Sequence, residues 1–185
     1  MRKLWSVTLV VLAVTTTGIR GTTAGQDDHD AVLRATLIGA NETPPISTDA
    51  TGSFKATVFS DGSITFRLTY SNLRANITQS HIHFAQKNVP GGIMIFLCGP
   101  PPMAGGSNPW AVCPDGQSGV VEGPITADNV VALAPQGIAA GDLAAALKAV
   151  GQGEGYANVH STMFPAGEIR GQVRVRGRLD KDEDD

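Results

Sequence analysis

Charged and aromatic residues are both scarce in this chain. Of its 185 residues, 17% are charged and 5% are aromatic, and the formal net charge is −3. A net negative charge makes nucleic acid a poor partner, because binding to phosphates depends on lysine and arginine. We therefore expect no nucleic-acid ligand.

Long hydrophobic runs and nucleotide-binding or hydrolase motifs are also missing. No stretch after Gly25 approaches the roughly 18 to 20 apolar residues that a transmembrane helix needs, so we expect no membrane-spanning segment there. The chain has no internal repeat, no phosphate-binding glycine loop and no Gly-x-Ser-x-Gly elbow. Nucleotide hydrolysis and serine-hydrolase chemistry therefore have no support.

The first residues have the pattern of a secretory signal. Met1-Arg2-Lys3 is followed by an apolar run from Leu4 to Val14, which is too short to span a bilayer comfortably. Small residues up to Ala24 predict cleavage there, although Arg20 is an unfavourable charge near the cut and an uncleaved anchor is the alternative. We expect residues 1–24 to be a signal peptide and the mature protein to be secreted, extracellular or periplasmic.

Two acidic segments flank a region of one-domain size. Residues 25–30 and 177–185 are rich in aspartate and glutamate and are too polar to bury. Residues 31–176 have the normal length of a single domain with its own core. The predicted organisation is therefore one domain between two solvated acidic segments.

The chain contains two cysteines, Cys98 and Cys113, around a segment rich in Gly, Pro and Ser. In a secreted protein this pair predicts a structural disulfide, worth about 3 kcal/mol for a loop of about 15 residues. Use of the cysteines as soft metal ligands is the weaker alternative, because an even pair in an oxidising compartment usually bonds to itself. Trp110 in the same loop either anchors a partner or packs onto its own loop.

Alternating or β-branched apolar segments separated by turn signals predict an all-β fold. The pattern is typical of an antiparallel β-sandwich, Ig-like or superoxide-dismutase-like Greek key, with one short α-helix. Asp61-Gly62 is the strongest hairpin signal, because glycine takes the positive φ of a tight primed turn. We expect a helix over Leu143–Val150, with Asp142 as its N-cap and Gly151 as the glycine that ends it. The expected strands are 31–38, 52–59, 63–70, 77–84, 92–97, 119–123, 155–161 and 168–176.

Three of the four histidines lie in two strand-like segments. His81 and His83 are two residues apart, so in a strand their side chains project from one face and can converge on one ion. His160 is the only other histidine in an ordered-looking segment and is the candidate third ligand. Three neutral imidazoles suit zinc or copper. The alternative is a metal-free arrangement in which one of His81 and His83 is buried against backbone carbonyls and the other is exposed.

Polar residues near His160 have two interpretations. Asn158 and Glu168 are candidates for second-shell groups that fix the imidazole tautomers, and Arg170 for attracting an anion to the metal. Alternatively, Glu168 and Arg170 form an ordinary cross-strand ion pair.

Several segments of the chain resemble the CHRD (chordin) domain family. They are Ala40-Asn41-Glu42-Thr43-Pro44-Pro45, Ser80-His81-Ile82-His83, Asn158-Val159-His160-Ser161 and Pro165-Ala166-Gly167-Glu168-Ile169-Arg170-Gly171-Gln172. The similarity covers roughly Ala31 to Val175 and implies an extracellular, β-sandwich-like domain. Such domains are repeated in animal chordins, which bind growth factors, and occur alone in secreted microbial proteins, so the resemblance implies an extracellular protein ligand. Phe84 after the His-x-His segment and the stapled cysteine loop depart from the family's usual pattern.

The histidine pattern is also similar to the plan of copper/zinc superoxide dismutase. Four histidines are too few for its two-metal site, but His81, His83 and His160 are enough for a copper-only centre, with Arg170 steering superoxide. The sequence therefore leaves two functions open: a non-catalytic extracellular binding or structural module, with or without a metal, and a copper-dependent redox enzyme. The enzyme requires all three histidines on one ion with an open coordination position. The sequence specifies no oligomeric state, and Asn41 and Asn76 lie in sequons that only a glycosylating host modifies.

Overall fold

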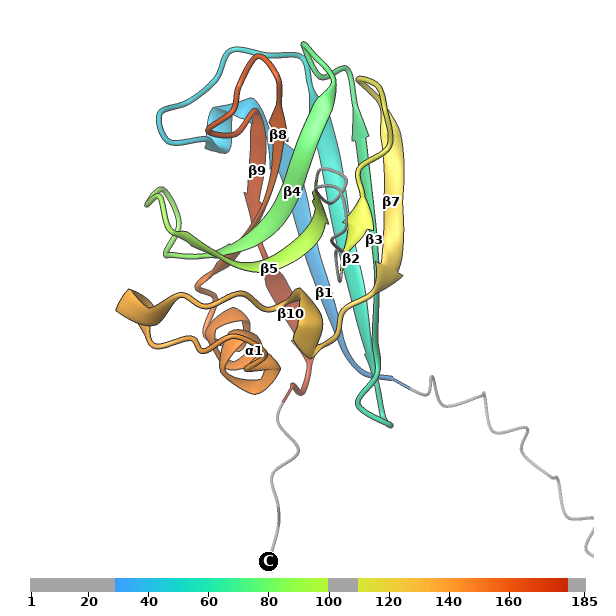
Figure 1. Ribbon diagram of the computed structural model, residues 1–185, viewed down its shortest axis with the longest axis vertical. Coiled ribbons are helices and arrows are strands. Elements are labelled where there is room, and N and C mark those ends of the chain that lie inside the picture. The colour runs from blue at the N-terminus through green and yellow to red at the C-terminus, as the bar shows by residue number, and fades with distance from the viewer. Residues whose placement is uncertain (1–28, 100–109, 180–185) are drawn as a thin grey trace, which may run out of the picture.

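The computed structural model describes residues 29–99 and 110–179, which form a predominantly β structure with one short α-helix (Figure 1). The predicted signal peptide, most of the N-terminal acidic segment, the interior of the cysteine loop and residues 180–185 lie outside the described residues. No helix in the described ranges is long and apolar enough to cross a membrane. The strands are β1 (His29–Ile38), β2 (Thr51–Phe59), β3 (Ile64–Ser71), β4 (Ile77–Phe84), β5 (Gly92–Gly99), β6 (Ala111–Val112), β7 (Gly119–Pro124), β8 (Gly155–Ser161), β9 (Ile169–Gln172) and β10 (Arg174–Gly177). The helix is α1 (Leu143–Gly151), and three 3₁₀ turns are η1 (Gly39–Asn41), η2 (Ala127–Asn129) and η3 (Ala134–Gln136).

The strands join one continuous, strongly curved sheet. Its order is β6-β5-β4-β8-β9-β1-β2-β3-β7, with β10 paired beside β1. All neighbouring strands in the described residues are antiparallel except β5 and β6, and the curvature brings the two ends of the sheet near each other (Figure 1). The all-β prediction with one short helix is therefore confirmed. Division into the two layers of a sandwich stays a prediction, because the hydrogen-bonded path is unbroken.

The hydrophobic core fills the inside of this curved sheet. Leu33, Phe54 and Leu68 on β1, β2 and β3 point inward and are buried. The alternate residues of the same strands are exposed or half-buried, because successive side chains of a strand point to opposite faces. The alternation read from the sequence therefore marks the core correctly in this part of the chain.

The predicted strand over residues 168–176 is two strands, β9 and β10. Between them lies Val173, whose N–H donates to the carbonyl oxygen of Gly155 and whose side chain is buried. This break lets β9 pair with β8 while β10 pairs with the first half of β1. The sequence alternates through Val173 without a turn signal, so the change of partner had no local marker.

Helix α1 begins where the sequence predicted and ends one residue later. The carboxylate of Asp142 accepts a hydrogen bond from the N–H of Ala145 at 2.9 Å, as expected of an N-cap. Gly151 is the last helical residue instead of the residue beyond the end. The left-handed backbone that turns the chain away belongs to Gly153, with a φ of 81°.

The β2–β3 hairpin is wider than the tight primed turn that Asp61-Gly62 predicted. Gly62 has the expected positive φ of 86°, but Asp61 does not, whereas the commonest primed turn needs it at both positions. The loop instead spans residues 60–63, where the Asp61 carboxylate accepts a hydrogen bond from the N–H of Ser63.

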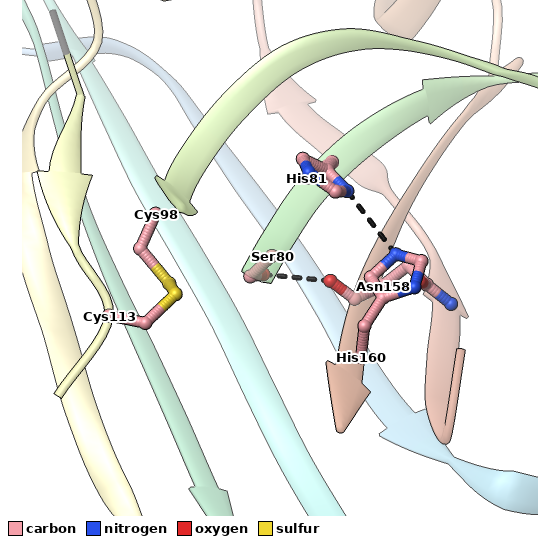
Figure 2. The surroundings of a disulfide bond; sticks show 6 residues. All are labelled: Ser80, His81, Cys98, Cys113, Asn158 and His160. Atoms are coloured by element: carbon pink, nitrogen blue, oxygen red, sulfur yellow. Dashed lines mark hydrogen bonds between the residues drawn. A yellow bond between two sulfur atoms is a disulfide. The ribbon is translucent and has the colours of Figure 1, made fainter. Parts of the chain in front are cut away.

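The predicted disulfide between Cys98 and Cys113 is confirmed (Figure 2). It joins the end of β5 to the residue after β6, with the two Cα atoms 5.0 Å apart. Both sulfurs are used in this bond, so the alternative of cysteine metal ligands is wrong. Trp110 stacks on Phe96 of β5 with ring centroids 4.0 Å apart, so it packs against the base of its own loop.

Candidate metal site

Three histidines converge in one buried cluster. The candidate ligand nitrogens of His81 and His83 on β4 and of His160 on β8 all lie within 4.8 Å of one another. The strands are antiparallel neighbours, with Gln79 opposite His160, so the three histidines share one face. Their exposed fractions are 0%, 7% and 5%. A common ligand set requires that His160 lie beside His81 and His83, and the geometry meets this condition.

The cluster lies on the face of β4 and β8 that points away from the main core. Ile82 and Val159 alternate with the histidines along these strands and belong to the core cluster. The histidine face is covered instead by loops and by Phe96 of β5, whose ring meets that of His81 edge-on at 4.3 Å. Because the covering is built from loops, it can hold polar groups without interrupting the core.

Backbone carbonyls fix the protonation of two of the rings. Nδ1 of His83 lies 3.0 Å from the carbonyl oxygen of Gly91, and Nδ1 of His160 lies 3.0 Å from that of Pro165. A carbonyl oxygen only accepts, so in each neutral ring Nδ1 carries the hydrogen and Nε2 keeps its lone pair. This is the arrangement in which a histidine binds metal through Nε2.

His81 completes the cluster from the side. Its Nδ1 lies 3.2 Å from Nε2 of His160 (Figure 2), and because that Nε2 carries no hydrogen, Nδ1–H of His81 donates to it in the neutral cluster. The Nε2 atoms of His81 and His83 are buried, with no hydrogen-bond partner among the described residues. Leaving a buried polar atom unpaired costs about 1–3 kcal/mol, so these two nitrogens fit a group that the protein itself does not supply.

The nitrogen separations are close to those of a single metal ion. Zinc bound tetrahedrally at 2.0–2.1 Å places its nitrogen ligands about 3.3 Å apart. The 3.2 Å between Nδ1 of His81 and Nε2 of His160 matches this spacing, and binding through that atom of His81 requires the other tautomer, in which Nδ1 no longer carries the hydrogen that it donates in the metal-free cluster. Since all the ligand atoms lie within 4.8 Å, the farthest pair has to approach by at most about 1.5 Å.

Burial keeps all three imidazoles neutral. Desolvation lowers the pKa of His81 to about 2, with further lowering by the nearby His160 and His83. Desolvation also lowers the pKa of His83 to about 4 and lowers the pKa of His160, although the carbonyls that these two rings face oppose the change. The neutral ring is the form that binds a metal ion.

Arg170 contacts the histidine cluster indirectly, through the ring of Tyr156. The Tyr156 ring stacks on the His83 ring at 4.8 Å with an interplanar angle of 3°, and the guanidinium carbon of Arg170 lies 3.6 Å from the Tyr156 centroid. Arg170 also donates to the carbonyl oxygen of Val89 and to the hydroxyl of Thr43. It therefore ties the loops that contain Thr43 and Val89 to the ring stack.

Glu168 does not contact the imidazoles or Arg170 through any hydrogen bond among the described residues. Its buried carboxylate accepts hydrogen bonds from the hydroxyls of Thr48 and Ser161 and from the N–H of Arg74, at 2.6–2.9 Å. Its contacts thus join the segments that contain Thr48, Arg74 and Ser161. The sequence had suggested two other roles for Glu168, fixing an imidazole tautomer or pairing with Arg170, and these hydrogen bonds serve neither.

Asn158 lies between His81 and Arg170 in the strand register but bonds elsewhere. Its side-chain amide donates to the carboxylate of Glu42 at 2.6 Å. Burial raises the pKa of Glu42 to about 7, although the nearby Arg170 and the bond from Asn158 oppose the rise. The tautomers of His83 and His160 are therefore set by the two backbone carbonyls, and Asn158 instead donates its hydrogen bond to Glu42.

Comparison with known families supports the resemblance seen in the sequence. The CHRD domain profile matches residues 33–173, which is most of the chain. The chain belongs to the CHRD domain family. The three histidines, Asn158 and Arg170 all fall inside the matched region of this CHRD domain. Comparisons with curated proteins and with solved structures gave no significant match.

The sequence did not reveal the groups that surround the histidines of this CHRD domain. The carbonyls of Gly91 and Pro165 have no side-chain signal, because every residue has a carbonyl. Phe96 and Tyr156 lie opposite His81 and His83 on the neighbouring strands. Knowledge of the strand pairing would have found both rings, but pairing between distant segments is not visible in the sequence.

Proposed function

We propose that this CHRD domain is a secreted, non-catalytic binding or structural module whose His81, His83 and His160 hold one zinc or copper ion. The observation that carries the proposal is that Nε2 of His81 and Nε2 of His83 are buried with no hydrogen-bond partner among the described residues, while backbone carbonyls orient the rings of His83 and His160. Neutral imidazoles suit both metals. The ion would join β4 to β8 and, through the carbonyls, to both covering loops.

Secretion and a single domain are part of the same proposal. The Cys98–Cys113 disulfide supports export, because such bonds persist in oxidising compartments. The family match over residues 33–173 and the end of β10 at Gly177 support a domain spanning about residues 31–176. An extracellular protein is the partner class that the family suggests.

A copper-dependent redox enzyme is the second candidate. It is favoured by the ligand count, because three protein ligands leave a coordination position open, as in catalytic sites. It is opposed by burial, since at most 7% of any of the three histidines is exposed to an approaching substrate. For this reason we prefer the non-catalytic module that holds a metal ion to the redox enzyme.

The test is the metal content of the mature, untagged protein, measured by elemental mass spectrometry. We expect near-stoichiometric zinc or copper in the wild type and its loss in a His81→Ala, His83→Ala double variant. His29→Ala is the matched control, because it removes the one histidine outside the cluster and should leave the metal in place.

Two results would decide against parts of the proposal. A protein that is isolated empty and takes up neither added zinc nor added copper has a purely structural histidine cluster. Rapid superoxide consumption by the copper-loaded wild type, absent in the double variant, would replace the holding role with the redox enzyme.

A further inference from the structure

A groove outside the histidine cluster is lined by positive charge. It has a volume of about 400 Å³ and lies over β1, β2 and β10, next to the loop after β4. Among the described residues, no aspartate or glutamate belongs to its lining, and the other polar lining residues are hydroxyl and amide side chains. The cations that line it are Arg34, Lys55, Lys87, Arg170, Arg174 and Arg176.

The strand register places three of these cations side by side. Arg34 on β1 lies directly opposite Lys55 on β2 and, on its other side, opposite Arg174 on β10. Neighbouring strands are about 4.8 Å apart, so the three charges form one row across the sheet. Arg176, two residues further along β10, projects from the same face. Like charges directly opposite each other destabilise a sheet, so this row costs stability.

The protein neutralises the end of this row but not the part in the groove. Arg67 on β3, which is opposite Lys55, forms an ion pair with Glu122 on β7. Within the described ranges, Arg34, Lys55 and Arg174 have no carboxylate partner. Within this row, the cations without a carboxylate partner among the described residues are therefore those that line the groove, where a ligand can reach them.

We propose that this groove binds an acidic oligosaccharide, a sugar chain that carries several sulfate or carboxylate groups. Cations repeated at about 5 Å match anionic groups repeated along a chain, and the neutral hydroxyl and amide groups can bond sugar hydroxyls. A volume of about 400 Å³ is within the range of ligand sites.

The lining favours an acidic sugar over single-stranded nucleic acid. Recognition of single strands depends on exposed aromatic rings on which bases stack. The one aromatic residue of the lining, Phe54, is 1% exposed and belongs to the core. The groove thus offers charge and hydrogen bonds without a stacking surface.

The test measures binding of a size-defined sulfated hexasaccharide to the full mature chain by isothermal titration calorimetry. The test variant is Arg34→Gln, Arg174→Gln, and the matched control is Arg74→Gln, Lys148→Gln. Both variants remove two positive charges, but Arg74 and Lys148 are exposed residues outside the groove. Arg170 is left intact, because its contacts support the loops over the histidines.

We expect the groove variant to bind the hexasaccharide at least about tenfold more weakly, since two charge-assisted contacts are lost, and the control to bind like the wild type. An uncharged oligosaccharide of the same length should not bind, and a polyuronate of that length should bind through the same residues. The groove variant should also melt no lower than the wild type, because it relieves repulsion within the row.

Three outcomes would overturn the proposal. The first is no hexasaccharide binding by the wild type at low salt. The second is equal weakening in the two double variants, which indicates only the net charge of the molecule. The third is tighter binding of a single-stranded oligonucleotide with the same number of charges, which assigns the groove to nucleic acid.

Discussion

At the residue scale, Glu42 is a buried carboxylate whose ionisation opposes folding. Its pKa is about 7 in the folded protein against 4.5 in its ordinary state, because burial disfavours the charge more than Arg170 and Asn158 favour it. The folded state holds this proton more tightly, so stability is lost as the pH rises from 4.5 through 7. Tyr156 faces the same region but stays neutral there, since burial raises its pKa above 10.

We therefore expect Glu42→Gln to stabilise the protein above pH 7. The amide oxygen still accepts the bond from Asn158, and the cost of burying a charge disappears, which is worth about 3 kcal/mol at pH 8 and almost nothing below pH 4.5. Urea unfolding at several pH values measures this, with the exposed Asp128→Asn as control. A variant less stable than the wild type at pH 8 would show that Arg170 stabilises the carboxylate more than burial penalises it.

The two tyrosines make a matched pair for the value of a buried hydroxyl. The Tyr156 hydroxyl accepts a hydrogen bond from the N–H of Gly91, whose carbonyl orients His83. The Tyr70 hydroxyl is buried with no partner among the described residues. Tyr156→Phe keeps the ring stack but leaves a donor unpaired, so it should cost about 1 kcal/mol and loosen His83. Tyr70→Phe should be neutral or slightly stabilising. Thermal unfolding of both variants measures the difference. Equal effects would contradict the assignment of a hydrogen bond to the Tyr156 hydroxyl alone.

At the scale of elements, the fold depends on a close crossing between β9 and β1. A Cβ atom at Gly171 of β9 would overlap the carbonyl oxygen of Thr36 on β1, whereas one at Gly123 of β7 would find its nearest neighbour, Phe66, at 3.8 Å. Both glycines lie in strands, so backbone propensity is similar for both. The difference between the two sites is therefore mainly steric.

Gly171→Ala should destabilise the protein by about 2–4 kcal/mol, because backbone cannot move aside as a flexible side chain can. Gly123→Ala should change the free energy of unfolding by less than about 0.5 kcal/mol. Denaturant titration of both variants measures this difference. If Gly171→Ala were tolerated as well as Gly123→Ala, the β9–β1 contact would be looser than described.

At the scale of the whole molecule, local patterns and long-range pairing were unequally visible in the sequence. Strands β4 and β8 have the predicted bounds, because each combines alternation or β-branched residues with clear flanking turns. The grouping of the histidines was predictable for a related reason. His81 and His83 already share one face of β4, so only one neighbouring strand has to bring a third histidine beside them. The cations of Arg34 and Arg174 were not recognised as neighbours, because only the pairing of β10 with β1 across most of the chain brings them together.

The Cys98–Cys113 disulfide affects the stability of the whole molecule, because it closes the loop between β5 and β6 and so restricts the unfolded chain. Cys98 lies in β5, and Cys113 directly follows β6, the edge strand that pairs with β5. We expect Cys98→Ala, Cys113→Ala to lower the free energy of unfolding by about 3 kcal/mol, and hydrogen exchange to quicken most in β5 and β6. The metal content should be unchanged, because both sulfurs are bonded to each other and neither belongs to the histidine set. Reduction of the wild type should give the same result. If exchange instead quickened equally in β1 and β2, the pairing of β5 with β6 would not depend on the disulfide, which would then act only on the unfolded chain.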